Sequence, residues 1–236
     1  MKRIIKRLLP QLCVITAICL VAAVSGIKRS VVTDASVGFT PVVIIDAGHG
    51  GFDGGAVAKD GTVEKHINLM IASKLQKMLE FNGYKVIMTR TDDTSTEDID
   101  GSIGARKKSD LKNRLKLMTE NPDAVYISIH LNKFTTSAAN GAQVFYTPNF
   151  KEAARLGECI QNSIAGQLQP ENTRVIKQGT SSTYILHNAK IPAVIVECGF
   201  LSNASELERL KDDKYRSKMS FAIFCGITDF FENGKG

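Results

Sequence analysis

The chain has 236 residues, of which 43% are hydrophobic, 23% charged and 7% aromatic, which excludes a disordered chain, a fibrous repeat and a polytopic membrane protein. The net charge of +6 arises in the first 29 residues, which hold six of the 30 basic residues and no acid. The remainder carries 24 basic against 24 acidic residues and therefore lacks the basic surface that nucleic-acid binding needs.

Residues 1–29 have the pattern of an export segment. Four basic residues in the first seven positions precede twenty uncharged residues (8–27), as in a secretory signal peptide or an N-terminal membrane anchor. The spacing of Ala23 and Ser25 is typical of a cleavage site, whereas the length of the run and the basic pair after it favour an anchor; both interpretations stay open. We predict a protein exported across the cytoplasmic membrane, secreted or anchored, that touches the membrane only through this segment. Residues 30–40 are predicted to form a linker.

Residues 41–234 are predicted to form one α/β domain of three layers. Apolar runs without polar alternation, such as residues 42–45, are typical of strands buried on both faces. Segments with helical spacing of apolar residues separate these runs, which indicates a mostly parallel central sheet of about six strands flanked by helices. The acidic residues 92–104 are expected to form a surface loop. The predicted strands cover residues 42–45, 84–89, 123–132, 141–147 and 193–200, and the predicted helices cover 63–81, 107–121, 151–169, 202–213 and 214–233.

Chemistry-bearing side chains follow three of the apolar runs. The apolar run 42–45 ends in the polar and glycine residues 46–49, which include His49, the run 126–129 ends in His130, and the run 194–196 ends in Glu197. Glu64 opens the helix after the first of these runs. In open α/β sheets, ligands bind outside the carboxyl ends of the strands. Two histidines and one carboxylate are a ligand set that catalytic zinc uses, and a further carboxylate can take the proton of a water molecule. His49, Glu64 and His130 are therefore candidate metal ligands, and Glu197 is a candidate base.

Other interpretations of these residues remain open from the sequence pattern. A single histidine at a strand end more often makes a structural hydrogen bond than binds a metal. Glu64 could serve only as a favourable charge at a helix N-terminus. Cys198 could be a thiol nucleophile, which would require a histidine base nearby, or an inert packed thiol. His66 and His187 are expected to be structural.

Several motifs occur in the same order as in the zinc-dependent N-acetylmuramoyl-L-alanine amidases of the type 3 family, which the chain resembles: IDAGHGG, EKHINL, a Thr-Arg pair, SIHLN, NTR and VECGFLSN. The resemblance implies one Zn²⁺ per chain, held by His49, Glu64 and His130, with Glu197 as the catalytic base. One departure from the family pattern, Ala47 in place of proline, touches no implied ligand.

Finer features are similar to the spore-cortex amidases of this family, namely the sequence RKKSDLKNR at residues 106–114 and the SIHLN and NTR motifs. The resemblance implies a peptidoglycan substrate, action in the forespore or cortex compartment, and a role in sporulation and germination through muramic-δ-lactam. Arg114, Arg174 and Asn132 lie in these motifs and are candidate substrate-binding residues.

The implied reaction is hydrolysis of the amide bond between N-acetylmuramic acid and L-alanine. Two alternatives remain, a zinc peptidase acting on peptidoglycan stem peptides and a non-catalytic cell-wall-binding module with a structural metal. Only eight residues (133–140) separate Asn132 from Gly141, too few for the inhibitory helix that some division amidases insert after the SIH motif. Any regulation is therefore expected to come from a separate partner protein.

Overall fold

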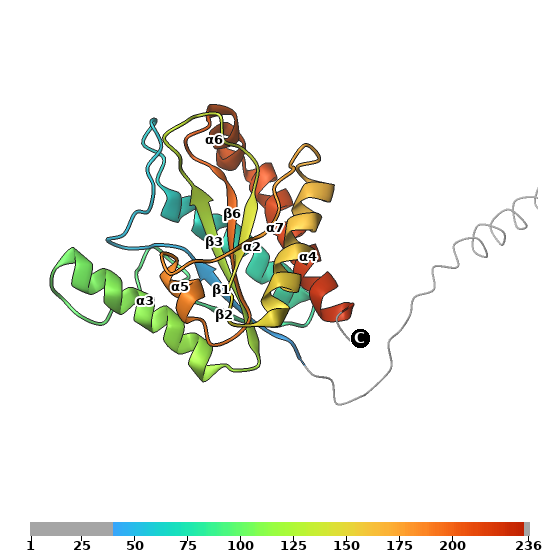
Figure 1. The fold of residues 1–236 in the computed structure, drawn as a ribbon. Helices are drawn as coiled ribbons and strands as arrows, with labels where there is room; N and C mark the ends of the chain where they lie inside the picture. The colour runs from blue at the N-terminus through green and yellow to red at the C-terminus, as the bar shows by residue number, and fades with distance from the viewer. Residues whose placement is uncertain (1–39, 234–236) are drawn as a thin grey trace, which may run out of the picture. The chain divides into compact units, whose positions relative to one another are not determined.

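The computed structural model describes residues 40–233, so the predicted export segment and all but the last residue of the predicted linker lie outside the described residues. A six-stranded sheet forms the centre of the domain in the order β2-β1-β3-β6-β4-β5 (Figure 1). The strands are β1 (Val42–Ala47), β2 (Lys85–Met88), β3 (Ala124–Asn132), β4 (Gln143–Tyr146), β5 (Lys177–Gln178) and β6 (Ala193–Phe200). All neighbouring strands are parallel except β4 and β6, which confirms the predicted mostly parallel sheet.

Helices cover both faces of the sheet and complete the three predicted layers (Figure 1). One face packs against α2, α4 and α7, and the other against α3 and α5. Among residues 40–233, no helix is long and apolar enough to cross a membrane. The helices are α2 (Glu64–Phe81), α3 (Ile103–Glu120), α4 (Lys151–Gln167), α5 (Tyr184–Asn188), α6 (Ala204–Lys211) and α7 (Asp213–Glu232).

The two-sided burial of the sheet explains why its strands lack polar alternation. In β1, Val43 and Ile45 pack into the core on the α2 side, while Ile44 packs into the core on the α3 side, and all three are fully buried. Because helices exclude water from both faces, each strand position favours an apolar side chain. A polar residue inside such a strand therefore requires a partner or a function.

Two features differ from the sequence prediction. The acidic segment 92–104 is mostly exposed, as predicted, but the loop is shorter because α3 already begins at Ile103, and the residues before that helix are tied to it. Thr96 donates its backbone N–H to Asp110 over 2.7 Å, and Glu97 pairs with Arg106. The Gly51 N–H also donates to Asp93 over 3.1 Å, which ties the segment to the loop after β1. The second difference is that the short α5 and β5 have no counterpart in the sequence prediction.

Candidate metal centre and active site

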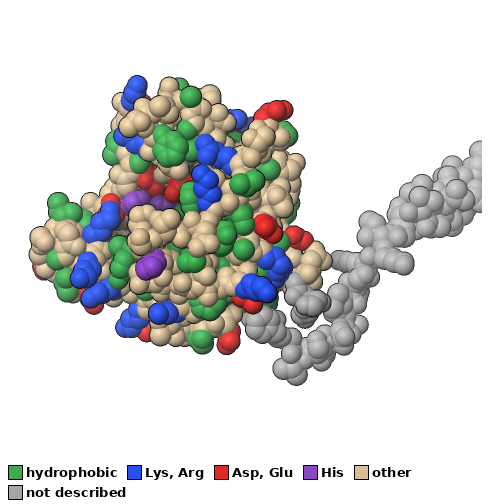
Figure 2. All heavy atoms as spheres, viewed as in Figure 1, with side chains coloured by type: hydrophobic (Ala, Val, Ile, Leu, Met, Phe, Trp, Pro, Cys, Tyr) green, Lys and Arg blue, Asp and Glu red, His purple; other side chains and the backbone are tan. Residues whose placement is uncertain are grey.

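The three side chains predicted as metal ligands converge at the carboxyl edge of the sheet. His49 follows β1, Glu64 opens α2 and His130 lies near the end of β3, and their ligand atoms all lie within 4.8 Å of one another. Oε1 of Glu64 lies 3.3 Å from Nε2 of His49 and 3.1 Å from Nδ1 of His130. Figure 2 shows histidine and acidic side chains together in a recess of this face. The donor set fits a zinc ion with a position left for water or substrate.

Glu64 is held by several hydrogen bonds and does not serve only as a charge at a helix N-terminus. Its side chain is 3% exposed, and Oε2 accepts a hydrogen bond from the Ala56 N–H over 2.8 Å. Oε1 accepts from the Leu131 N–H over 3.0 Å and from the Asn68 amide over 3.2 Å. These bonds to three separate segments fix the carboxylate in the recess, and such fixed orientation is what a metal ligand requires.

His49 is oriented by a carboxylate that the sequence prediction missed. Nδ1 of His49 lies 2.9 Å from Oδ2 of Asp53, which leaves Nε2 facing Glu64. Burial lowers the pKa of His49, but hydrogen bonds with Asp53 and Glu64 outweigh it and raise that pKa to about 9. The surroundings thus favour positive charge at this point, whether a proton or a metal ion supplies it. The sequence could have indicated Asp53, because a histidine that binds a metal usually donates its other ring N–H to a nearby carboxylate.

Glu197 lies beside His130 on the neighbouring strand. The two residues are register partners in β3 and β6, so their side chains project from the same face of the sheet. Both residues lie within their strands, in agreement with the predicted strand ranges 123–132 and 193–200. Oε2 of Glu197 is buried and has no hydrogen-bond partner among residues 40–233. Burial, opposed by the charge of His130, raises the pKa of Glu197 to about 7, so the carboxylate is poised to accept a proton near neutral pH.

The same row of side chains continues into β4. Gln143 is the register partner of Glu197 on the antiparallel side, and it is 4% exposed. Its Oε1 accepts a hydrogen bond from Nη1 of Arg174 over 3.1 Å, and Arg174 also donates to the Asn140 carbonyl. The guanidinium lies 4.8 Å from the centre of the Phe200 ring. Arg174 is thereby placed two side chains from Glu197, whereas Asn132 lies half-buried at the end of β3.

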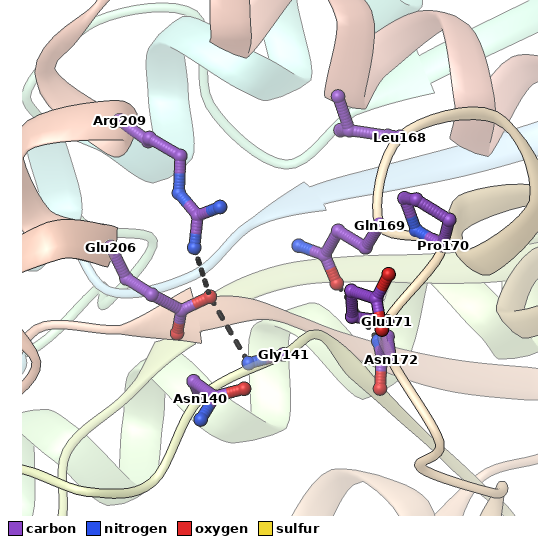
Figure 3. Close-up of a pocket in the computed structure, with 9 residues that line it drawn as sticks. All are labelled: Asn140, Gly141, Leu168, Gln169, Pro170, Glu171, Asn172, Glu206 and Arg209. Atoms are coloured by element: carbon purple, nitrogen blue, oxygen red, sulfur yellow. Dashed lines mark hydrogen bonds and ion pairs between the residues drawn. The ribbon is translucent and has the colours of Figure 1, made fainter.

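A polar cavity of about 120 Å³ is lined by Asn140, whose carbonyl accepts from Arg174, and by residues of α6 and of the loop after α4 (Figure 3). Glu206 and Arg209 point toward each other on one side, and Glu206 also accepts the Gly141 N–H over 3.0 Å. A second cavity of about 240 Å³, lined in part by Arg174, shares Asn140, Glu171 and Asn172 with the first. The second cavity therefore offers polar room beside Arg174, whereas neither cavity is lined by Glu197 or Gln143.

Arg114 differs from the prediction. Its side chain is only 3% exposed, and it forms ion pairs with Asp46 and with Asp110, the latter 2.8 Å from Nε. Nη2 donates to the His49 carbonyl over 2.8 Å. The substrate contact predicted for Arg114 does not fit this placement, because its donors already have partners inside the protein. The motif match therefore singled out Arg114 but did not predict that its side chain is buried.

The remaining histidines stay apart from the centre. His66 is exposed on α2 and His187 is exposed on α5, and neither belongs to the metal-binding group found among residues 40–233. The angular offset of about 200° between positions 64 and 66 of a helix keeps His66 off the face that Glu64 occupies.

Comparison with known proteins decides the family. The family profile Amidase_3, described as N-acetylmuramoyl-L-alanine amidase, matches residues 43–229. The chain belongs to this amidase family. The match spans every strand of the sheet apart from the first residue of β1, and it includes all three residues of the metal-binding group.

Individual relatives agree with this assignment. The germination-specific N-acetylmuramoyl-L-alanine amidase of Bacillus subtilis strain 168 is 36% identical over 192 residues, which are 80% of this chain and 79% of the relative. The CwlD amidase of Clostridioides difficile, solved in complex with the GerS lipoprotein, has a TM-score of 0.79 and 38% identity over 82% of this chain and 100% of that one. An N-acetylmuramoyl-L-alanine amidase of Clostridium difficile 630 has a TM-score of 0.71 and 29% identity over 84% and 100%. The protein is therefore a peptidoglycan N-acetylmuramoyl-L-alanine amidase.

Cys198 of this amidase is packed, and we expect thiol chemistry to have no part in its activity. The side chain is 0% exposed, and burial raises the pKa of its thiol well above the ordinary value, so the reactive thiolate does not form. We expect activity to survive iodoacetamide and the substitution Cys198→Ala, but to disappear with 1,10-phenanthroline. Loss of activity on alkylation while the metal content stays unchanged would contradict this.

Gly48 of the amidase leaves the space that the His130 ring occupies. A Cβ atom at this position would lie 2.3 Å from Nε2 of His130, too close for any real contact. We expect Gly48→Ala to displace the ring from Glu64 and to lower zinc affinity and activity by about 10-fold or more. The matched control is Gly104→Ala in α3, where a Cβ would meet no atom of the described residues within 4 Å. Equal zinc affinity in both variants would show that His130 does not need its observed position.

Proposed function

We propose that this amidase uses one zinc ion, held by His49, Glu64 and His130, with Glu197 as its catalytic base, and that residues 41–234 form the catalytic domain. One observation carries the proposal. A convergent group of two imidazoles and a buried carboxylate lies next to a second buried carboxylate whose Oε2 has no partner in the described part of the chain. The first set suits a metal and the second suits proton transfer.

The roles of the side chains follow from their surroundings. Zinc, when bound, supplies Lewis-acid chemistry, which polarises a carbonyl oxygen and lowers the pKa of water. Oε2 of Glu197 accepts the proton of the attacking water and returns it to the departing amine of L-alanine. The bond that breaks joins the lactyl carboxyl carbon of N-acetylmuramic acid to that nitrogen. Asp53 holds His49 in place by accepting the Nδ1 hydrogen.

Arg174 and Asn132 are proposed to contact the substrate. Arg174 is half-buried beside the Glu197 row, and a guanidinium is well suited to a carboxylate of the stem peptide. Gln143 accepts one of its hydrogens and so directs the side chain along β4. Asn132 follows His130 by two positions on β3 and so projects from the same face of the sheet.

We further propose that the enzyme is exported and acts on the spore cortex, where removal of the peptide precedes muramic-δ-lactam formation. Support comes from the 36% identity to the germination-specific amidase and the 38% identity to CwlD. The test is muropeptide analysis of spores from a deletion strain. Muramic-δ-lactam should be absent and should return with the native gene but not with Glu197→Gln. Normal lactam in the deletion strain would exclude this biological role.

Control by a separate protein is proposed as well. CwlD was solved in complex with the GerS lipoprotein, and this chain is similar to CwlD along most of its length. The loop between β3 and β4 is held back by bonds from Lys133 to the Val57 carbonyl and from the Phe134 N–H to Ser202, so it does not act as an inhibitory helix. Activity and zinc content of the full chain, alone and with excess zinc, provide the test. Full activity of the chain alone would show that no activator is needed.

A further inference from the structure

His49 has a backbone conformation that needs external support. Its φ is 63°, and it is the sole non-glycine residue with positive φ among residues 40–233. This left-handed conformation is unfavourable for a side chain with a Cβ, and it persists only where neighbouring groups hold the backbone in place. Because His49 is a proposed metal ligand, the groups that hold its backbone also affect the position of its imidazole.

Two buried arginines hold the carbonyls around His49. Arg90 donates from Nε to the Ala47 carbonyl over 2.8 Å and from Nη2 to the Gly48 carbonyl over 3.1 Å. Arg114 donates from Nη2 to the His49 carbonyl itself over 2.8 Å. The three consecutive carbonyls that lead from β1 into the loop are therefore all fixed by guanidinium groups. The Arg114 bond acts on the carbonyl of the strained residue.

Arg114 is itself held on two sides. Asp46 of β1 pairs with Nη1, and Asp110, one turn earlier on α3, pairs with Nε over 2.8 Å. Asp46 in turn accepts a hydrogen bond from the Ser128 hydroxyl of β3 over 2.6 Å. This network joins α3, β1 and β3 to the His49 carbonyl, although none of these groups reaches the ligand atoms. The planar fork of an arginine makes these contacts simultaneously, which a lysine ammonium cannot do.

We propose that Arg114 is a positioning residue, which holds the left-handed backbone of His49 and thereby directs its imidazole at the metal. Asp53 fixes the ring from the side-chain end, and Arg114 fixes the same residue from the backbone end. The inference rests on the proposed function, because it requires a metal at His49, Glu64 and His130.

The experiment compares zinc affinity in Arg114→Lys, Arg114→Met and Met118→Ala of the full chain, purified in detergent. Affinity is measured by competition with a chromophoric chelator, and the visible absorption of bound Co²⁺ reports the geometry of the site. Met118 is fully buried on the same helix, so its truncation costs stability without touching the His49 carbonyl. We expect about 10-fold weaker zinc binding or more and an altered Co²⁺ spectrum in both Arg114 variants, and no change in Met118→Ala.

Arg114→Lys keeps the charge between Asp46 and Asp110, so it provides the decisive result should Arg114→Met fail to fold. Parent-like zinc affinity and Co²⁺ spectrum in Arg114→Lys would overturn the positioning role alone. Equal loss of affinity in Met118→Ala would overturn it too, because general destabilisation would then suffice. A parent chain that binds no zinc would instead overturn the proposed metal centre, and the inference with it.

Discussion

Replacement of Glu197 by glutamine is expected to lower turnover by about 100- to 10,000-fold, the usual contribution of a general base. Glutamine has nearly the same shape but cannot accept the proton of water at neutral pH. Because Glu197 is not one of the converging ligands, zinc content should stay at about one ion per chain. Turnover is measured by release of stem peptides from purified peptidoglycan, and zinc by elemental analysis of the same sample.

Glu208→Gln is the matched control for this change. Glu208 is an exposed residue of α6 that pairs with Lys211, and its substitution should leave turnover unchanged. A Glu197→Gln enzyme that retains most of its turnover would exclude Glu197 as the base. A Glu197→Gln enzyme that loses its zinc would instead place this carboxylate among the ligands.

The second large effect concerns the metal ligands. Replacement of His49 or His130 by alanine leaves one imidazole and one carboxylate, which hold zinc poorly. We expect zinc affinity to fall by more than about 100-fold, because loss of a ligand exceeds the 10- to 100-fold cost of losing one of its hydrogen-bond partners. Activity should fall in parallel, as measured with and without added zinc.

His187→Ala is the control for the ligand variants, because this histidine is exposed on α5 and lies outside the metal-binding group of the described residues. It should bind zinc as the parent does. Full zinc occupancy in His49→Ala and His130→Ala would be incompatible with the proposed ligand set. Folding of each variant is checked by circular dichroism, so that loss of metal is not confused with unfolding.

The sequence pattern located the converging residues because they break a strong rule. Buried parallel strands are almost entirely apolar, so His130 and Glu197 stand out within their strands, as does His49 just after β1. Parallel neighbours carry such residues to one edge of the sheet, where His49 and His130 converge on Glu64 and Glu197 lies beside His130. The same rule does not predict that Gln143 lies beside Glu197, because this position depends on the pairing of β4 with β6.

The direction of β4 could have been predicted from the length of its connection. Only residues 133–142 separate β3 from β4, and a parallel connection needs a crossover of about a dozen residues or more, usually with a helix. The short loop passes to the far side of β6, and β4 therefore runs antiparallel to it. The sequence pattern predicted the strand but not its partner.

Arg114 shows where a motif stops being informative. Its ion pair with Asp46 joins residues 68 positions apart, and the contact depends on how α3 packs against β1. An arginine inside a matched motif can contact the substrate or form a buried structural contact. The residue type alone does not distinguish these two roles. Burial and hydrogen-bond partners do, and they place Arg114 behind the His49 loop.

The most direct test of the account is mass spectrometry of purified peptidoglycan after incubation with the zinc-loaded full chain. Cleavage by the proposed amidase releases stem peptides with a free L-alanine amine and leaves glycan strands that carry intact lactyl groups. These products should appear with the parent enzyme and be absent with Glu197→Gln or after chelation. Products cut within the stem peptide would identify a peptidase instead. Unchanged peptidoglycan, despite full zinc occupancy and any required activator, would contradict the proposed catalytic centre.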